Sequence, residues 1–127
     1  MPFVRIDLVE GRGAAFAQTL GDLVYRAMAE TIDVPADDKF QIITEHPRRE
    51  LNFASSYLGI EHSAGLVMIQ ITLSAGRARE KKQALYRRIA GDLHASLAIR
   101  PQDVLINLVE TAREDWSFGN GLAQYVA

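Results

Sequence analysis

The stretch "MPFVRIDLVEGR", residues 1–12, combines the pattern of a β-strand with a turn. Between residues 3 and 8, one alternate set of side chains is aliphatic and the other set contains Arg5 and Asp7. This period of two is typical of a strand with one buried face. Pro2 stands directly ahead of the strand, at a place where a proline, which has no backbone N–H, is tolerated.

The same pattern recurs later in the chain. Gly11-Arg12 returns as Gly76-Arg77, an offset of 76 − 11 = 65 positions. Apolar residues spaced four apart, as on one face of a helix, match at this offset. The matched pairs are Leu20 and Leu85, Val24 and Ile89, Met28 and Leu93, and in addition Asp38 and Asp103. The chain therefore reads as an internal repeat of strand, turn, helix and strand.

The repeat defines the expected organisation of a single domain, residues 1–127. Its halves are residues 2–43 and 67–108, with a central connection at 44–66 and a C-terminal tail at 109–127. Each half is a β-α-β unit, which favours a right-handed crossover between parallel strands. Two units predict an α/β (α+β) fold with a four-stranded, mostly parallel sheet and both helices on one face.

The other face of that sheet would have no cover within the chain. The segment "GLVMIQITL", residues 65–73, is almost continuously apolar, as expected for a strand that is buried on both faces. Symmetric assembly is the usual way in which soluble proteins cover such a surface. The sequence therefore predicts an oligomer.

Composition limits the class of protein. The 127 residues are 48% hydrophobic and 24% charged, the balance of an ordinary globular domain, and the net charge of −2 gives no support for nucleic-acid binding. The absence of cysteine excludes disulfides and thiol catalysis. No apolar run approaches the roughly 18 residues of a membrane span, and charged residues come too early for a signal peptide. We expect a cytoplasmic protein without membrane contact.

Two stretches carry candidate chemistry. If Met1 is removed, as a small second residue generally permits, Pro2 carries a free secondary amine; otherwise Pro2 only opens a strand. Gly76 and Arg77 lie between a strand end and a helix start, where free N–H groups favour a carboxylate. Arg77 and Arg79 could add a bidentate clamp, or could belong to a solvated helix face. The histidines show no metal-ligand spacing, and the glycines form no nucleotide-binding fingerprint, so we expect no metal and no cofactor.

Four motifs carry a resemblance to a known family. They are "MPFVRIDLVEGR" at 1–12, "VPADDKFQ" at 34–41, "DVLINLVE" at 103–110 and "EDWSFGNG" at 114–121. The chain resembles the tautomerase superfamily, and within it the malonate semialdehyde decarboxylase group. The resemblance implies a homotrimer of fused β-α-β units that acts on small keto, enol or semialdehyde acids without a cofactor.

The resemblance also implies roles for individual residues. Pro2 stands at the position of the catalytic proline, and Asp38 at that of an aspartate that orders water or polarises the site. Arg77 stands at the second of two substrate-binding arginines, whereas Ala75 replaces the first. Trp116 and Phe118 match aromatic residues that form a wall of the pocket.

Three functions remain open from the sequence. An apolar pocket around Trp116 and Phe118 would lower the pKa of the Pro2 amine and make it a general base, hence a keto–enol tautomerase. A higher pKa would make Pro2 a cation, hence a decarboxylase-like lyase or hydratase. The third possibility is a trimeric carboxylate-binding protein without catalysis. Because Ala75 removes one arginine, we expect the tautomerase.

Overall fold

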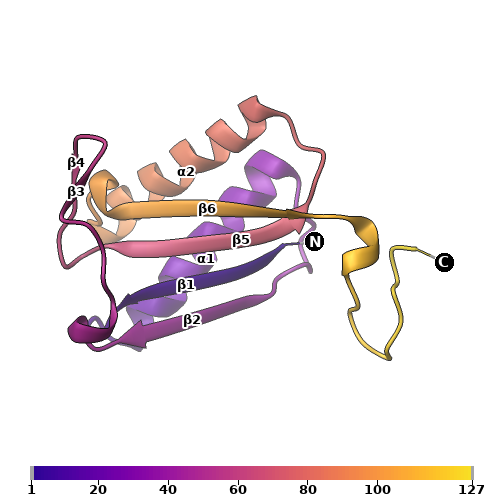
Figure 1. The fold of residues 1–127 in the computed structure, drawn as a ribbon, viewed down its shortest axis with the longest axis horizontal. Helices are drawn as coiled ribbons and strands as arrows, with labels where there is room; N and C mark the ends of the chain where they lie inside the picture. The colour runs from indigo at the N-terminus through magenta and orange to yellow at the C-terminus, as the bar shows by residue number, and fades with distance from the viewer. Residues whose placement is uncertain (1, 127) are drawn as a thin grey trace.

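The computed structural model describes residues 2–126, and its centre is a four-stranded sheet (Figure 1). The strands are β1 (Phe3–Val9), β2 (Gln41–His46), β5 (Val67–Ser74) and β6 (Val104–Thr111), in the order β2-β1-β5-β6. β1 pairs in parallel with β2, and β5 with β6, while β1 and β5 run antiparallel where the two halves meet. The prediction of a four-stranded sheet made of two β-α-β units is confirmed, and the sheet is mixed.

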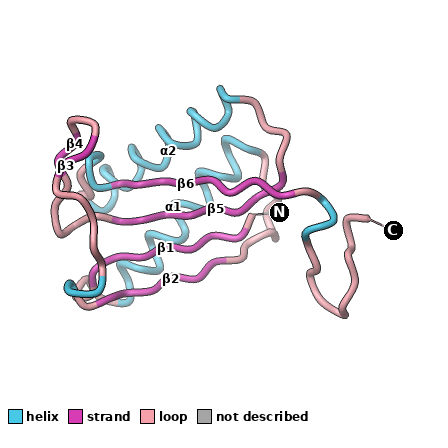
Figure 2. Tube along the Cα trace, in the orientation of Figure 1, coloured by secondary structure: helices cyan, strands magenta, loops and turns pink. Residues whose placement is uncertain are grey.

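Both helices lie on one face of this sheet, as expected (Figures 1 and 2). α1 spans Ala14–Ile32 and α2 spans Arg79–Leu97, so their bounds are also 65 positions apart (79 − 14 = 65). The apolar stripes of the two helices are buried against the aliphatic residues of β1 and β5. Among the described residues, neither helix is long and apolar enough to cross a membrane.

The link between each helix and the following strand has the same form in both halves. α1 ends at Asp33 and α2 at Ala98, both with left-handed backbone (φ 62° and 56°). A turn follows, closed by the Asp38 N–H donating to the Pro35 carbonyl at 3.1 Å and by the Asp103 N–H donating to the Arg100 carbonyl at 2.8 Å. Each half thus delivers a buried aspartate to the entry of its second strand.

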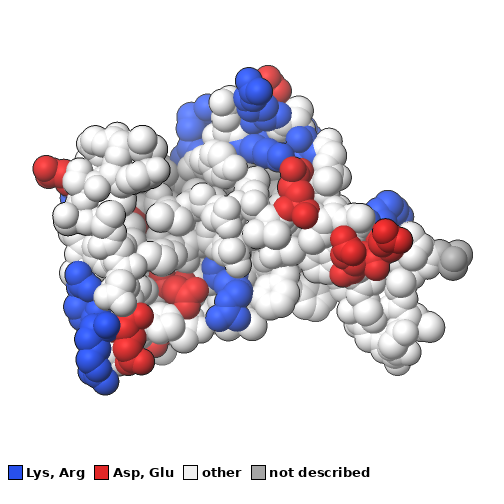
Figure 3. All heavy atoms as spheres, viewed as in Figure 1, with Lys and Arg blue, Asp and Glu red and all other residues white. Residues whose placement is uncertain are grey.

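The second face of the sheet is uncovered in the chain. In β5, Val67 and Ile69 are buried under the helices, whereas Met68 is half-buried and Gln70 is exposed. Within residues 2–126 no other element crosses that face, as expected for a sheet with both helices on one side (Figure 1). Burial of β5 on both faces through assembly stays a prediction. Figure 3 shows that this face carries scattered charges and is otherwise largely uncharged.

The central connection and the tail flank the sheet at opposite ends (Figure 1). The connection contains a short helical turn, η1 (Arg48–Glu50), and a hairpin of β3 (Ser56–Tyr57) and β4 (Ile60–Glu61). A second turn, η2 (Pro101–Asp103), precedes β6. The tail begins with a third, η3 (Arg113–Asp115), and projects beyond the end of β6 where β1 starts.

Candidate active site

The start of the chain is held at one end of the sheet. Pro2 is buried and directly precedes β1. Two residues further, the Val4 N–H donates to the Phe40 carbonyl at 3.0 Å, which fixes the start of β1 beside the segment that leads into β2. His46 pairs with Val9 at the other end of β1 and bonds to Asp7 there, so it lies away from Pro2.

Asp38 lies near this end and is 5% exposed. Its Oδ1 is buried and has no hydrogen-bond partner among the described residues. Burial raises the pKa of the Asp38 carboxyl. The positive charge of the chain's N-terminal amine lowers this pKa, and so does the charge of Arg77, whereas the charge of Asp37 raises it further. A buried carboxylate oxygen without a donor is costly and marks a position where a ligand can supply one.

The counterpart aspartate has a different environment. Asp103 is 2% exposed, and its Oδ1 accepts the Ser63 N–H at 2.8 Å. Its Oδ2 accepts the Ser63 hydroxyl at 2.5 Å and an Arg100 N–H at 3.5 Å. Because its carboxylate is satisfied from within the chain, Asp103 serves the fold, whereas Asp38 retains an unused acceptor.

This contrast predicts opposite effects of two identical substitutions on stability. The raised pKa of Asp38 means that the folded state loses stability as the pH rises through that pKa, so Asp38→Asn is expected to raise Tm at pH 7. The gain should shrink as the pH falls below about 4, where the carboxyl is protonated in both states. Asp103→Asn loses charge-assisted hydrogen bonds and is expected to lower stability by about 1.5–3 kcal/mol. Thermal unfolding between pH 3 and pH 8 measures both, and a lower Tm for Asp38→Asn at pH 7 would contradict this assignment.

Arg77 extends from the turn between β5 and α2 toward the first half of the chain. Its Nε and Nη2 donate to the Ile32 carbonyl, both at 3.4 Å, and its Nη1 donates to the Ser74 carbonyl at 3.2 Å. Gly76 has φ 124°, a conformation that side chains disfavour, so this turn needs glycine. Arg77 therefore sits at the end of α1, within electrostatic range of Asp38.

The first turn of α2 adjoins Arg77. Its N-cap, Ala78, supplies no side-chain hydrogen bond, so the first N–H groups of the helix have no side-chain cap. Arg79, the first residue of α2, is exposed and makes no side-chain hydrogen bond within residues 2–126. Ala75, directly before Gly76, is also exposed, and its N–H donates to the Thr111 carbonyl at 2.9 Å.

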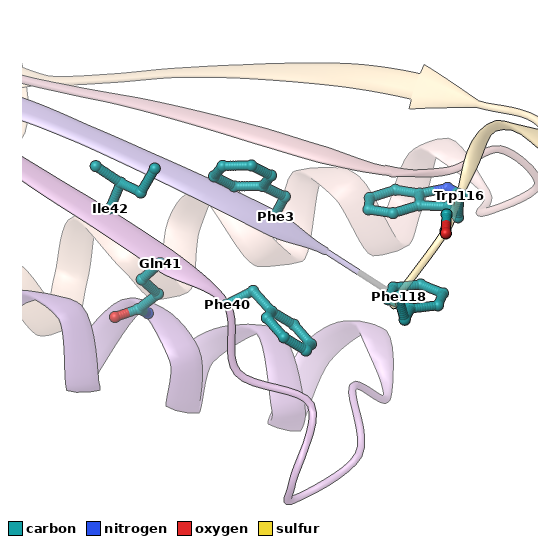
Figure 4. Close-up of a pocket in the computed structure, with 7 residues that line it drawn as sticks. Phe3, Phe40, Gln41, Ile42, Trp116 and Phe118 are labelled. Carbon is teal, nitrogen blue, oxygen red and sulfur yellow. The ribbon is translucent and has the colours of Figure 1, made fainter. Parts of the chain in front are cut away.

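An aromatic wall closes the same end of the sheet (Figure 4). Trp116 and Phe118 stack with their centroids 5.6 Å apart and their planes 9° from parallel. Phe118 also lies 6.3 Å from Phe40, and the indole N–H of Trp116 donates to the Thr111 hydroxyl at 2.7 Å. Together with Phe3 and Ile42 from the sheet, they line a pocket of about 390 Å³. The tail thus carries both aromatic residues to the sheet end where β1 begins.

Sequence reasoning missed Phe3, Phe40 and Tyr125 as components of this region. Tyr125 packs edge-on against Phe118 at 5.1 Å, and Arg113 lies 5.3 Å over its ring. Burial raises the pKa of Tyr125, as does the charge of Asp38, while Arg113 and Arg77 lower it. For Phe3 and Phe40 the available signal was their position next to Pro2 and Asp38. Tyr125 lies in the C-terminal tail, outside the repeated pattern, so no sequence signal places it at this site.

The arrangement suits an acid–base reaction on a small anion. It offers an arginine and an uncapped helix start for a carboxylate, an unpaired buried carboxylate oxygen, and an apolar surface for the rest of the molecule. Among residues 2–126, no group of three or more His, Cys, Asp or Glu side chains is placed to hold a metal ion.

Comparison with known proteins gives consistent matches over the whole chain. A family model described as "Tautomerase enzyme" matches residues 38–119, and a second model with the same description matches residues 2–59. The probable tautomerase YusQ of Bacillus subtilis is 43% identical over 126 residues, 99% of each chain. The probable tautomerase YrdN of the same organism is 37% identical over 126 residues, 99% of this chain and 97% of its own.

A solved structure agrees in fold. The crystal structure of a malonate semialdehyde decarboxylase, described together with its decarboxylase and hydratase activities, superimposes with a TM-score of 0.91 at 32% identity. The match covers 98% of this chain and 95% of that chain.

Proposed function

The chain belongs to the tautomerase family, and from this premise we propose that it is a cofactor-independent keto–enol tautomerase of small keto or enol acids. In this proposal Met1 is removed, and the secondary amine of Pro2 transfers the proton. The observation that carries the proposal is Asp38, a buried carboxylate with one unpaired oxygen near the start of β1. Such a group costs stability and is explained by a role toward a ligand.

The proton transfer proceeds at the Pro2 nitrogen. The neutral amine accepts the hydroxyl proton of an enol acid. It returns a proton to the other carbon of the C=C bond, the one next to the carbon that bears the hydroxyl. The O–H bond breaks and a C–H bond forms, while the C=C double bond is replaced by C=O. The unpaired Oδ1 of Asp38 accepts a hydrogen bond from the enol hydroxyl or from the protonated amine.

The substrate carboxylate binds at the turn between β5 and α2. Arg77 supplies the charged donor, and the uncapped N–H groups at the start of α2 add a partial positive charge. Arg79 is exposed two residues away, where it can approach an anion from solvent. Gly76 permits the turn that brings the strand end and the helix start together.

The aromatic wall determines the remainder of the substrate. Trp116 and Phe118 present flat apolar surface next to Phe3 and Phe40, which suits a planar conjugated or aryl group. This surface also favours the neutral form of a nearby amine, because burial in apolar surroundings disfavours a charge. A neutral amine is the form that acts as a base.

Decarboxylation is the second candidate, favoured by the structural match to malonate semialdehyde decarboxylase. Breaking a C–C bond requires the carboxylate to be held so that this bond aligns with the carbonyl π system. A pair of arginines fixes that torsion, whereas this chain has alanine at position 75 and one arginine at 77. Keto–enol tautomerisation breaks no C–C bond, so it does not need the substrate carboxylate to be held as rigidly as decarboxylation does.

A direct comparison of substrates tests this choice. On protein with a confirmed N-terminus, kcat/KM for ketonisation of phenylenolpyruvate is expected to exceed kcat/KM for malonate semialdehyde by at least about tenfold, since one charged hydrogen bond corresponds to roughly one to two decades. Restoring an arginine with Ala75→Arg should raise the semialdehyde rate selectively. A preference of tenfold or more for the semialdehyde in the unaltered protein would overturn the ranking.

The proposed assembly is a homotrimer, supported by the uncovered sheet face. Leu105 and Val109 are exposed there, outside the pocket, and symmetric contacts would bury them. Light scattering at micromolar concentration is expected to give about three times the chain mass of 14.1 kDa. A stable monomer would exclude the trimer without affecting the assignment of Pro2.

A further inference from the structure

The second half of the chain contains a counterpart of the candidate active site. The pairs related by the 65-residue offset are Pro2 and Val67, Arg12 and Arg77, and Asp38 and Asp103. As Arg77 reaches from the second half to the end of α1, Arg12 reaches from the first half toward Gly65 and Asp103. A cavity of about 290 Å³ lies there, lined in part by Arg12, Phe16, Ser63, Leu97, Arg100 and Asp103.

This cavity lacks the catalytic groups. The nitrogen of Val67 belongs to an internal peptide bond and has no basic lone pair. Both carboxylate oxygens of Asp103 already accept hydrogen bonds from Ser63 and Arg100, in contrast to the unpaired oxygen of Asp38. The counterpart cannot perform the proton transfer proposed for Pro2.

Its arginine, in contrast, is retained. Arg100 lies against Asp103 and balances its charge, whereas the guanidinium of Arg12 makes no hydrogen bond or ion pair within residues 2–126. The Arg12 guanidinium lies 4.9 Å over the ring of Phe16, which holds its position. A Cβ at Gly65 would come within 2.9 Å of the Arg12 Nη2, so the glycine makes room for this side chain. One positive charge without a partner thus lines a preformed cavity.

We propose that this cavity is a second, non-catalytic site that binds a small monocarboxylate on Arg12. One unbalanced guanidinium matches one carboxylate in charge and in bidentate geometry. The nearby Asp103 carboxylate disfavours a dianion such as phosphate. Phe16, Leu97 and Ile99 supply apolar surface for a short hydrocarbon group. The chain then has two carboxylate positions on one repeated scaffold, and only the first has a base.

Backbone amide NMR with isobutyrate as the probe tests the proposal. In an Arg77→Gln background, which weakens the first site, isobutyrate is expected to shift the amide resonances of Arg12, Gly65 and Ala98 in a saturable manner. Inorganic phosphate at the same ionic strength should shift them less. Absence of saturable shifts at these amides, or an equal response to phosphate, would overturn the proposal.

Two variants locate the binding group. Arg12→Gln removes the charge, and Gly65→Ala leaves every charge in place but fills the space beside the Arg12 Nη2. Each is expected to weaken isobutyrate binding about tenfold or more, while Arg87→Gln, at an exposed arginine of α2, should not. Unchanged affinity in Arg12→Gln with the folded spectrum retained would refute the assignment. Tautomerase turnover should persist in Arg12→Gln, so this result is independent of the function proposed for Pro2.

Discussion

Replacing Pro2 by alanine is expected to lower kcat/KM for ketonisation of phenylenolpyruvate by about 10²–10⁴-fold, the usual loss when an acid–base group is removed. Alanine leaves a primary amine in place of the secondary amine, and Pro2→Gly adds flexibility to the chain start. Both variants should show the loss. The measurement requires protein in which intact mass has shown removal of Met1, because a retained Met1 converts the proline nitrogen into an amide.

The control for this prediction is Pro101→Ala, at an exposed proline that opens η2 away from the candidate active site. Its turnover should equal that of the unaltered protein. If Pro2→Ala and Pro2→Gly retain the full rate on protein without Met1, then Pro2 only opens the edge of β1.

Arg77→Gln is expected to raise KM for the same enol acid by about 10–150-fold, with a smaller effect on kcat. The estimate corresponds to the roughly 1.5–3 kcal/mol of a charged hydrogen bond. Arg77 also donates to the carbonyls of Ile32 and Ser74, so Tm should fall modestly in the same variant. The KM is therefore measured well below the unfolding transition.

Two arginines of α2, the helix that follows Arg77, serve for comparison. Arg79→Gln measures how much of the anchor comes from the exposed neighbour of Arg77, and Arg87→Gln controls for loss of one positive charge. An unchanged KM in Arg77→Gln would place the carboxylate elsewhere. An equal rise in KM for all three variants would indicate long-range attraction instead of a bound contact.

Much of the fold follows from the sequence because the pattern is periodic and occurs twice. The four-residue spacing of Leu20, Val24 and Met28, repeated in Leu85, Ile89 and Leu93, predicts two helices with one buried face each, and both form. The antiparallel pairing of β1 with β5 was not predictable in this way. It depends on the path of the central connection, whose polar residues carry no periodic signal.

The candidate site could be predicted only in its separate parts. The proposals for Pro2, Asp38 and Arg77 came from family resemblance and from the chemistry of their positions, and the structure adds that Asp38 has an unpaired oxygen. The meeting of Phe118 with Phe40 joins residues 78 positions apart (118 − 40 = 78). Contacts of this kind arise when a tail folds over a sheet end, and no local pattern encodes them.

The central claim is that the Pro2 nitrogen is a free amine that acts as the base. It is tested most directly by ¹⁵N NMR of proline-labelled protein across pH, compared with the pH dependence of kcat/KM. The chain has four prolines, and only an N-terminal one has a nitrogen that can titrate. One titrating resonance is expected, absent in Pro2→Ala, and its midpoint should coincide with the pH at which kcat/KM rises. A Pro2 nitrogen that does not titrate, or that remains protonated where the enzyme is fully active, would contradict this claim.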